Sequence, residues 1–109
     1  MKLTVAGRHI QVTQAIEDHL TQKIEKVLGN LDEAADVHAA LSVEKHRHFA
    51  EITIKTKGFS VHSESETDDL YTAMDLAVEK IDKQIKKHWE RIKSKQVKQN
   101  QAEKTKESD

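Results

Sequence analysis

The chain has 109 residues, of which 34% are charged and 36% hydrophobic, and its formal net charge is −1. This length suits one domain with a small core, and only four aromatic residues leave an interior that is mainly aliphatic. The absence of cysteine excludes disulfides, thiolate metal sites and cysteine nucleophiles. No apolar run approaches bilayer length and the first residues turn polar too soon for a signal peptide, so we expect a cytoplasmic protein with no membrane partner.

The first part of the chain predicts a strand followed by a helix. Apolar and polar residues alternate over 2–6 and the run ends near Gly7, which is typical of a short strand. Thr13 is a suitable N-cap, and apolar residues then recur at helical spacing as far as Gly29. This spacing predicts a helix over 14–28.

Three alternating runs follow, over 37–44, over 49–55 and from residue 59 onward. Lys57 and Gly58 predict a turn between the last two, so these runs indicate antiparallel strands joined by hairpins. Because each run is apolar on one face, we expect the sheet to be covered on one side only. The apolar positions are Val37, Ala39, Leu41, Val43, Ala50, Ile52, Ile54, Phe59 and Val61.

A second, longer helix is predicted from Thr67-Asp68-Asp69, which supply a cap and carboxylates suited to the positive end of a helix dipole. The element order is therefore β-α-β-β-β-α, an α/β fold of the α+β kind, with a four-stranded mixed sheet and two helices packed on one face. Residues 96–109 have too few apolar side chains to form a core, so we expect a folded domain over 1–95 and a disordered polar tail. The apolar stripe of the second helix consists of Leu70, Met74, Ala77, Ile81, Ile85, His88 and Ile92.

The second helix also carries the cationic excess of the chain. Residues 80–95 contain seven Lys/Arg against two Asp/Glu, a net +5, whereas 1–79 carry −6 and the tail is neutral. Cations one helical turn apart are spaced like successive phosphates of a nucleic acid, so this pattern favours a phosphate backbone as partner. The alternative is a solvated helix end whose cations complement the dipole. Lys80, Lys83, Lys87 and Arg91 are expected roughly opposite the apolar stripe, with Lys86 and Lys93 flanking it beside Trp89.

Two aromatic residues of this helix have two interpretations each. Trp89 lies between cations and could stack on a base, yet a lone Trp beside an apolar stripe more often closes a core, which is the interpretation we favour. Tyr71 has the same ambiguity.

The seven histidines raise the question of a metal site. His46 and His48 flank Arg47, an unfavourable neighbour for a dication, and no carboxylate is spaced in sequence to orient the imidazoles. The chain has no Gly-rich phosphate loop and no nucleophile elbow. We therefore expect no metal, no cofactor, no small-molecule substrate and no enzymatic activity.

Three stretches carry a resemblance to a known family. They are LTVAGRHIQVTQAI at 3–16, LSVEK at 41–45, and DLYTAMD at 69–75 followed by KIDKQIKKH at 80–88. Over about residues 1–95 the chain resembles the short-form ribosome hibernation promoting factors, a family that includes ribosome-associated inhibitor A. The resemblance implies a domain similar in architecture to double-stranded RNA-binding domains.

The resemblance also implies a function. Such a protein binds ribosomal RNA of the small ribosomal subunit in the messenger and transfer RNA channel, inhibits translation during stress or stationary phase, and promotes ribosome hibernation by steric exclusion. A short form acts alongside a separate ribosome modulation factor. The neutral tail leaves open whether ribosomes are dimerised or held as inactive monomers, and we favour hibernation promotion. Carried over by position, the RNA-binding residues are Lys80, Lys83, Lys86, Lys87 and Arg91, with Lys23 and Lys26 from the first helix.

Two other functions remain open at this point. The first is a double-stranded RNA-binding module that is not specific to the ribosome and is therefore displaced by generic duplex. The second is a protein-interaction domain that uses the exposed face of the sheet and depends little on the charge of the second helix.

Overall fold

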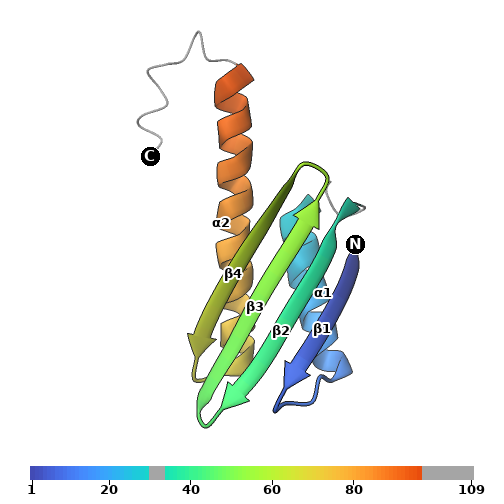
Figure 1. Ribbon diagram of the computed structural model, residues 1–109, viewed down its shortest axis with the longest axis vertical. Helices are drawn as coiled ribbons and strands as arrows, with labels where there is room; N and C mark the ends of the chain where they lie inside the picture. Colours follow the sequence, from blue (N-terminus) through green and yellow to red (C-terminus); the bar gives the residue numbers. More distant parts are fainter. Residues whose placement is uncertain (30–33, 97–109) are drawn as a thin grey trace.

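The computed structural model describes residues 1–29 and 34–96, with side chains described as far as Glu90. Two helices and four strands follow one another in the predicted order β-α-β-β-β-α (Figure 1). The predicted boundary at residue 95 and the predicted disorder of 96–109 stay predictions. The elements are β1 (Lys2–Arg8), α1 (Gln14–Leu28), β2 (Asp36–Glu44), β3 (Arg47–Thr56), β4 (Phe59–Thr67) and α2 (Leu70–Gln96).

The strands form one mixed sheet in the order β1-β2-β3-β4. β1 runs parallel to β2 because α1 crosses between them, whereas β2, β3 and β4 pair antiparallel. Tight turns make the two hairpins, with positive φ at Lys45 (56°) and at Gly58 (101°). The prediction of a four-stranded mixed sheet is therefore confirmed.

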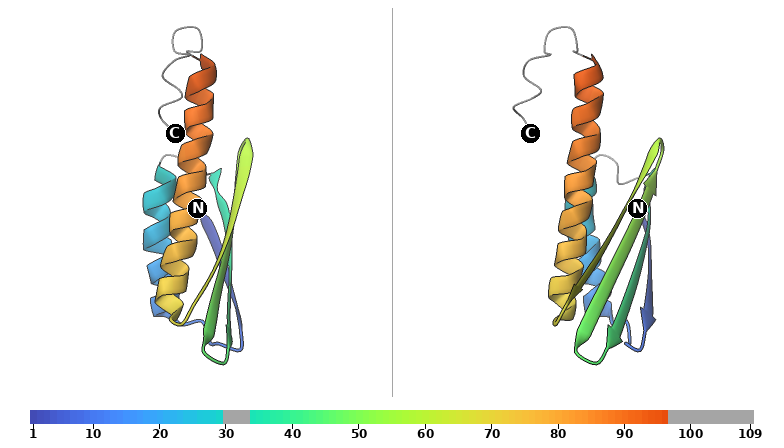
Figure 2. Two further views of the ribbon diagram at one scale, coloured as in Figure 1. Left: turned by 90° about the vertical axis from the view of Figure 1, so that its left-hand side faces the viewer. Right: turned by 60° about the vertical axis from the view of Figure 1, so that its left-hand side comes forward.

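Both helices cover the same face of the sheet, so the molecule has two layers (Figure 2). The predicted apolar strand positions are buried between these layers, except that Val43 and Phe59 are only half-buried. The opposite face of the sheet is exposed, as the one-sided alternation predicts. The largest fully buried side chains are Leu20, Ile24, Val37, Leu41, Ile52, Ile54, Met74 and Ile81.

α1 begins and ends where the sequence predicts. The Thr13 hydroxyl oxygen accepts a hydrogen bond from the Ile16 N–H at 3.3 Å, which satisfies one of the free donors at the helix start. Gly29 adopts a φ of 51° and its N–H bonds to the Glu25 carbonyl, which closes the last turn. Neither described helix combines the length and the apolar content needed to cross a bilayer.

β4 differs from its predicted pattern because its inward-facing residues become polar after Val61. Ser63 and Ser65 point toward α2 and donate hydrogen bonds to the backbone carbonyls of Ala77 and Ala73 respectively. The Ser63 contact measures 2.8 Å and the side chain is buried. Small residues on both elements thus let α2 lie close to β4, which fixes how the helix is rotated on the sheet.

Candidate nucleic-acid interface

The second helix is started by a side chain cap. The Asp69 carboxylate accepts hydrogen bonds of 2.9 Å from both the N–H and the hydroxyl of Thr72, and these bonds lower the pKa of Asp69 below its ordinary value. The Thr67 hydroxyl oxygen in turn accepts from the Asp69 N–H at 3.1 Å. The prediction of Thr67 as the cap and of carboxylates in the first turn is therefore wrong in detail, because Asp69 itself caps the helix and the first turn contains no acidic residue.

Packing of one side of α2 on the sheet decides where its cations point. Met74, Ala77, Ile81 and Ile85 of the predicted stripe are all buried. Leu70 and His88, near the two ends of the stripe, are half-buried. Ala73 and Val78 widen the buried stripe beyond the prediction. The remaining sector of the helix therefore faces solvent.

Lys83 and Lys87 occupy the solvent-facing sector, as predicted. Both side chains are exposed, and neither forms an ion pair or hydrogen bond within the part of the chain that the structure describes. Arg91 follows one turn after Lys87 on the same helix, and its side chain lies outside the described residues. Within the described residues, therefore, two ammonium groups one turn apart have no ion-pair partner.

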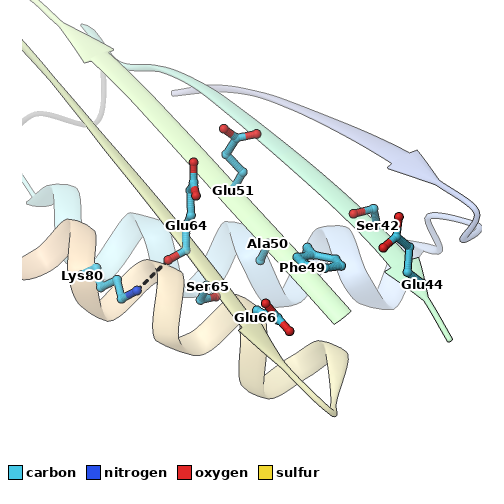
Figure 3. A pocket seen from close by; sticks show the side chains of 9 residues that line it. All are labelled: Ser42, Glu44, Phe49, Ala50, Glu51, Glu64, Ser65, Glu66 and Lys80. Carbon is cyan, nitrogen blue, oxygen red and sulfur yellow. Dashed lines mark hydrogen bonds between the residues drawn. The ribbon is translucent and has the colours of Figure 1, made fainter. Parts of the chain in front are cut away.

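Lys80 lies elsewhere than predicted. Its ammonium donates a 2.6 Å hydrogen bond to the carbonyl oxygen of Glu64, so the side chain lies against the free edge of β4 rather than opposite the apolar stripe (Figure 3). Gln84, one turn later, bonds to both the N–H and the carbonyl of His62 on the same strand. Because α2 lies close to β4, Lys80 and Gln84 reach the edge of the sheet. They form hydrogen bonds with backbone groups of β4 that would otherwise face solvent.

The other predicted site cations face carboxylates. Lys86 pairs with Asp82 at 3.1 Å, one helical turn away, with 72% of the lysine side chain still exposed. On α1, the Lys23 ammonium lies 4.0 Å from Asp75, which also accepts a 2.6 Å hydrogen bond from His19. Lys26 lines the groove between the helices together with Lys23 and acidic residues of α2. Lys23 and Lys26 thus border α2, but their surroundings are of mixed charge.

Part of the exposed face of the sheet is acidic. An open hollow of about 540 Å³ lies over β2, β3 and β4, with Lys80 at its margin. Arg47 binds the Glu66 carboxylate at 2.6 and 3.3 Å; this hydrogen bonding lowers the pKa of Glu66 and raises that of Arg47. Four glutamates surround the hollow: Glu44, Glu51, Glu64 and Glu66 (Figure 3).

One histidine on this face does have carboxylate partners, contrary to expectation. His62 Nε2 lies 3.3 Å from Glu51 and 3.6 Å from Glu64, while its Nδ1 shares a 2.8 Å hydrogen bond with the Thr53 hydroxyl. The sequence did not show this because Glu51 reaches His62 across a strand pair. Within the described residues this is the one group with metal-ligand potential, and its exposed side chains already pair with one another.

Trp89 is not the core lid that we favoured, since 43% of it is exposed. It contacts the rings of Phe59 and His88 edge-on, at centroid distances of 6.5 and 5.6 Å. Tyr71 is 39% exposed and contacts the His19 ring edge-on at 4.9 Å. Both aromatic residues thus lie at the margin of the core.

Comparisons with known proteins place the chain in a family. The model of the Sigma 54 modulation protein / S30EA ribosomal protein family matches residues 3–93, and the chain belongs to this family. A ribosome hibernation promoting factor of Pseudomonas putida is 33% identical over 94 residues, which cover 86% of this chain and 92% of that protein. The ribosome hibernation promoting factor of Azotobacter vinelandii is 31% identical over 108 residues, which cover 99% of this chain and 97% of that protein.

A solved structure agrees with this assignment. The N-terminal domain of Thermus thermophilus Protein Y superposes with a TM-score of 0.73 at 29% identity, covering 81% of this chain and 99% of that domain. The resemblance stated from the sequence motifs is therefore confirmed, as is the fold class. The predicted likeness to double-stranded RNA-binding domains stays a prediction.

Proposed function

We propose that this protein is a ribosome hibernation factor that inhibits translation by occupying the messenger and transfer RNA channel of the small ribosomal subunit. Family membership supports the hibernation role, because the relatives are ribosome hibernation promoting factors. The observation that carries the proposed contact is the pair of exposed cations Lys83 and Lys87 on α2, which have no partner in the part of the chain that the structure describes. Phosphate oxygens of ribosomal RNA are suitable partners for such a pair.

The proposed mechanism is steric and needs no chemical step. Contacts between α2 and the RNA backbone supply affinity, and the body of the domain then excludes transfer RNA from the channel. The RNA-binding surface in this proposal comprises Lys80, Lys83, Lys86, Lys87 and Arg91, with Lys23 and Lys26 of α1 at its border. Action in the cytoplasm beside a separate ribosome modulation factor belongs to the same proposal.

Co-sedimentation with intact ribosomes and with separated subunits tests the proposal. We expect the protein to follow the small subunit and to dissociate as salt rises, with log affinity falling by about 0.7–0.9 per phosphate contact against log salt concentration. An excess of generic RNA duplex provides the competitor. Displacement by duplex at the same concentration as by free subunits would favour a generic double-stranded RNA-binding module, and binding that ignores salt would contradict the phosphate contacts.

A further inference from the structure

Trp89 lies on the surface in a fixed aromatic setting. Phe59, beside the β3–β4 turn, stacks on His88 with 4.1 Å between ring centroids and 22° between their planes. The indole stands edge-on to both rings, at interplanar angles of 76° and 69°. These contacts hold the indole at the margin of the core and still leave 43% of the residue exposed.

The same residue continues a row of cations. Lys83, Lys86 and Trp89 are separated by three positions each, and residues three apart on a helix are surface neighbours about 5–6 Å apart. Lys86 is paired with Asp82, but this exposed pair is weak enough to exchange for a phosphate. The C-terminal end of α2 extends past the sheet (Figures 1 and 2), and Lys83, Lys86 and Trp89 are all exposed. A ligand that touches Lys83 and Lys86 therefore reaches Trp89 next.

We infer that Trp89 is a stacking site for an unpaired nucleobase of the RNA whose phosphates contact Lys83 and Lys86. A flat aromatic surface beside cations matches one nucleotide chain, because the phosphates meet the ammonium groups and an unstacked base covers the ring. A protein partner is the poorer match, since interface cores are depleted in lysine. The inference rests on the proposed RNA-binding function and adds that the target contains a single-stranded or extruded nucleotide.

Tyr71 supplies a matched control on the same helix. It is exposed to a similar degree, 39% against 43%, but lies beside His19, whose ring bonds to Asp75. A carboxylate there disfavours an approaching phosphate backbone. The Tyr71→Ala variant therefore removes an exposed aromatic ring without removing the proposed stacking site.

Fluorescence provides the direct test, because Trp89 is the only tryptophan of the chain. A decamer of uridylate RNA should quench the emission of the wild-type protein, whereas an abasic decamer of equal charge should bind at low salt without quenching. The same quenching is expected for Tyr71→Ala. Equal quenching by the two decamers, or no quenching by uridylate RNA, would overturn the inference.

Ribosome binding separates this inference from the function on which it rests. We expect Trp89→Ala to weaken co-sedimentation with the small subunit by about five-fold or more, Trp89→Phe to retain most of the affinity, and Tyr71→Ala to bind as wild type. Thermal melts establish that each variant is folded. If the wild-type protein binds the small subunit and a folded Trp89→Ala variant binds with the same affinity, the stacking site is overturned but the ribosomal function is not. If the wild-type protein does not bind the small subunit, the proposed ribosomal function is overturned. The fluorescence measurement with the decamers would then decide whether Trp89 stacks on a nucleobase.

Discussion

The glutamate-lined part of the outer sheet face and the outward sector of α2 carry opposite charge, and they differ in how far these charges are paired within the described residues. On the exposed face of the sheet, Glu66 is held by Arg47, and Glu51 and Glu64 lie beside His62. On the outward sector of α2, Lys83 and Lys87 have no partner among the described residues. The acidic face is thus partly neutralised within the fold, whereas the basic sector needs a partner from outside. A net charge of −1 conceals this difference completely.

A similar contrast exists within α2 itself. Lys80 and Lys83 are one turn apart and both exposed, but the ammonium of Lys80 is bound to the β4 backbone, whereas that of Lys83 has no partner among the described side chains. Both residues are lysines of the same basic segment of α2, so the sequence pattern does not distinguish them. What differs is the proximity of the strand edge, so the position around the helix decides whether an ammonium group is already engaged within the fold before RNA binds.

The largest expected effect comes from reversing the free cations. Lys83→Glu with Lys87→Glu should lower affinity for the small subunit by at least about 100-fold, because two attractive phosphate contacts become repulsive. The fold should persist, since both side chains are exposed. Co-sedimentation measures the affinity, and a circular-dichroism melt checks the fold.

The outer sheet face offers a control with the same change in net charge. Lys2 and Lys55 are exposed there, with Asp36 between them in the strand register. Lys2→Glu with Lys55→Glu should leave ribosome binding within about two-fold of wild type, because screening weakens charges on the far side of the domain. Equal loss in both double variants would mean that net charge, not the α2 surface, governs binding. A collapsed melt of the α2 variant would assign a structural role to its lysines.

Single substitutions of Lys83 and Lys80 should have smaller and unequal effects on affinity for the small subunit. Lys83→Gln should weaken binding by about three- to ten-fold and reduce the slope of log affinity against log salt by about 1. Lys80→Gln should weaken it by about two-fold or less, since the Lys80 ammonium is already engaged by the Glu64 carbonyl. Isothermal titration with small subunits over a salt series gives both quantities. A larger loss from Lys80→Gln would show that this hydrogen bond breaks when RNA binds.

The fold was predictable because its signals are local. The alternating apolar positions of β2 and β3, the Thr13 cap and the Gly29 stop are each read from a few neighbouring residues, and all are confirmed. β4 was predicted only in part, because Ser63 and Ser65 replace apolar residues on its inner face. Their partners are backbone carbonyls of a helix that begins later in the sequence, which alternation cannot reveal.

The candidate site was predictable in composition but not in arrangement. Helical periodicity placed Lys83 and Lys87 correctly on the exposed sector, since it depends only on the stripe that packs inward. It failed for Lys80 because α2 lies against a strand edge, and for Trp89 because Ile85 is the last buried residue of α2 among the described side chains. The partners of His62 come from strand pairing, so spacing along the chain did not show them.

The smallest expected effect concerns pH and the acidic face. Because hydrogen bonding to Arg47 holds the folded-state pKa of Glu66 below its ordinary value of 4.5, the pair stabilises the fold above that pH. The stabilisation is lost as pH falls through the folded-state value, where the carboxylate becomes protonated. Glu66→Gln should therefore lower the melting temperature by about 1–4 °C at pH 7, and the difference should vanish in strong acid.

Glu25 of α1 is the control for that measurement, since its exposed side chain has no ion pair or hydrogen bond within the described part of the chain. Glu25→Gln should melt as wild type at every pH. Ribosome binding at pH 7 should be unchanged in Glu66→Gln, because the carboxylate lies on the outer face of the sheet, whereas Lys83 and Lys87 lie on the outward sector of α2. A weaker ribosome affinity in this variant, with an unchanged melt, would instead mean that the acidic part of the sheet face also contacts the ribosome. The proposal that RNA binding is confined to the α2 surface would then be wrong.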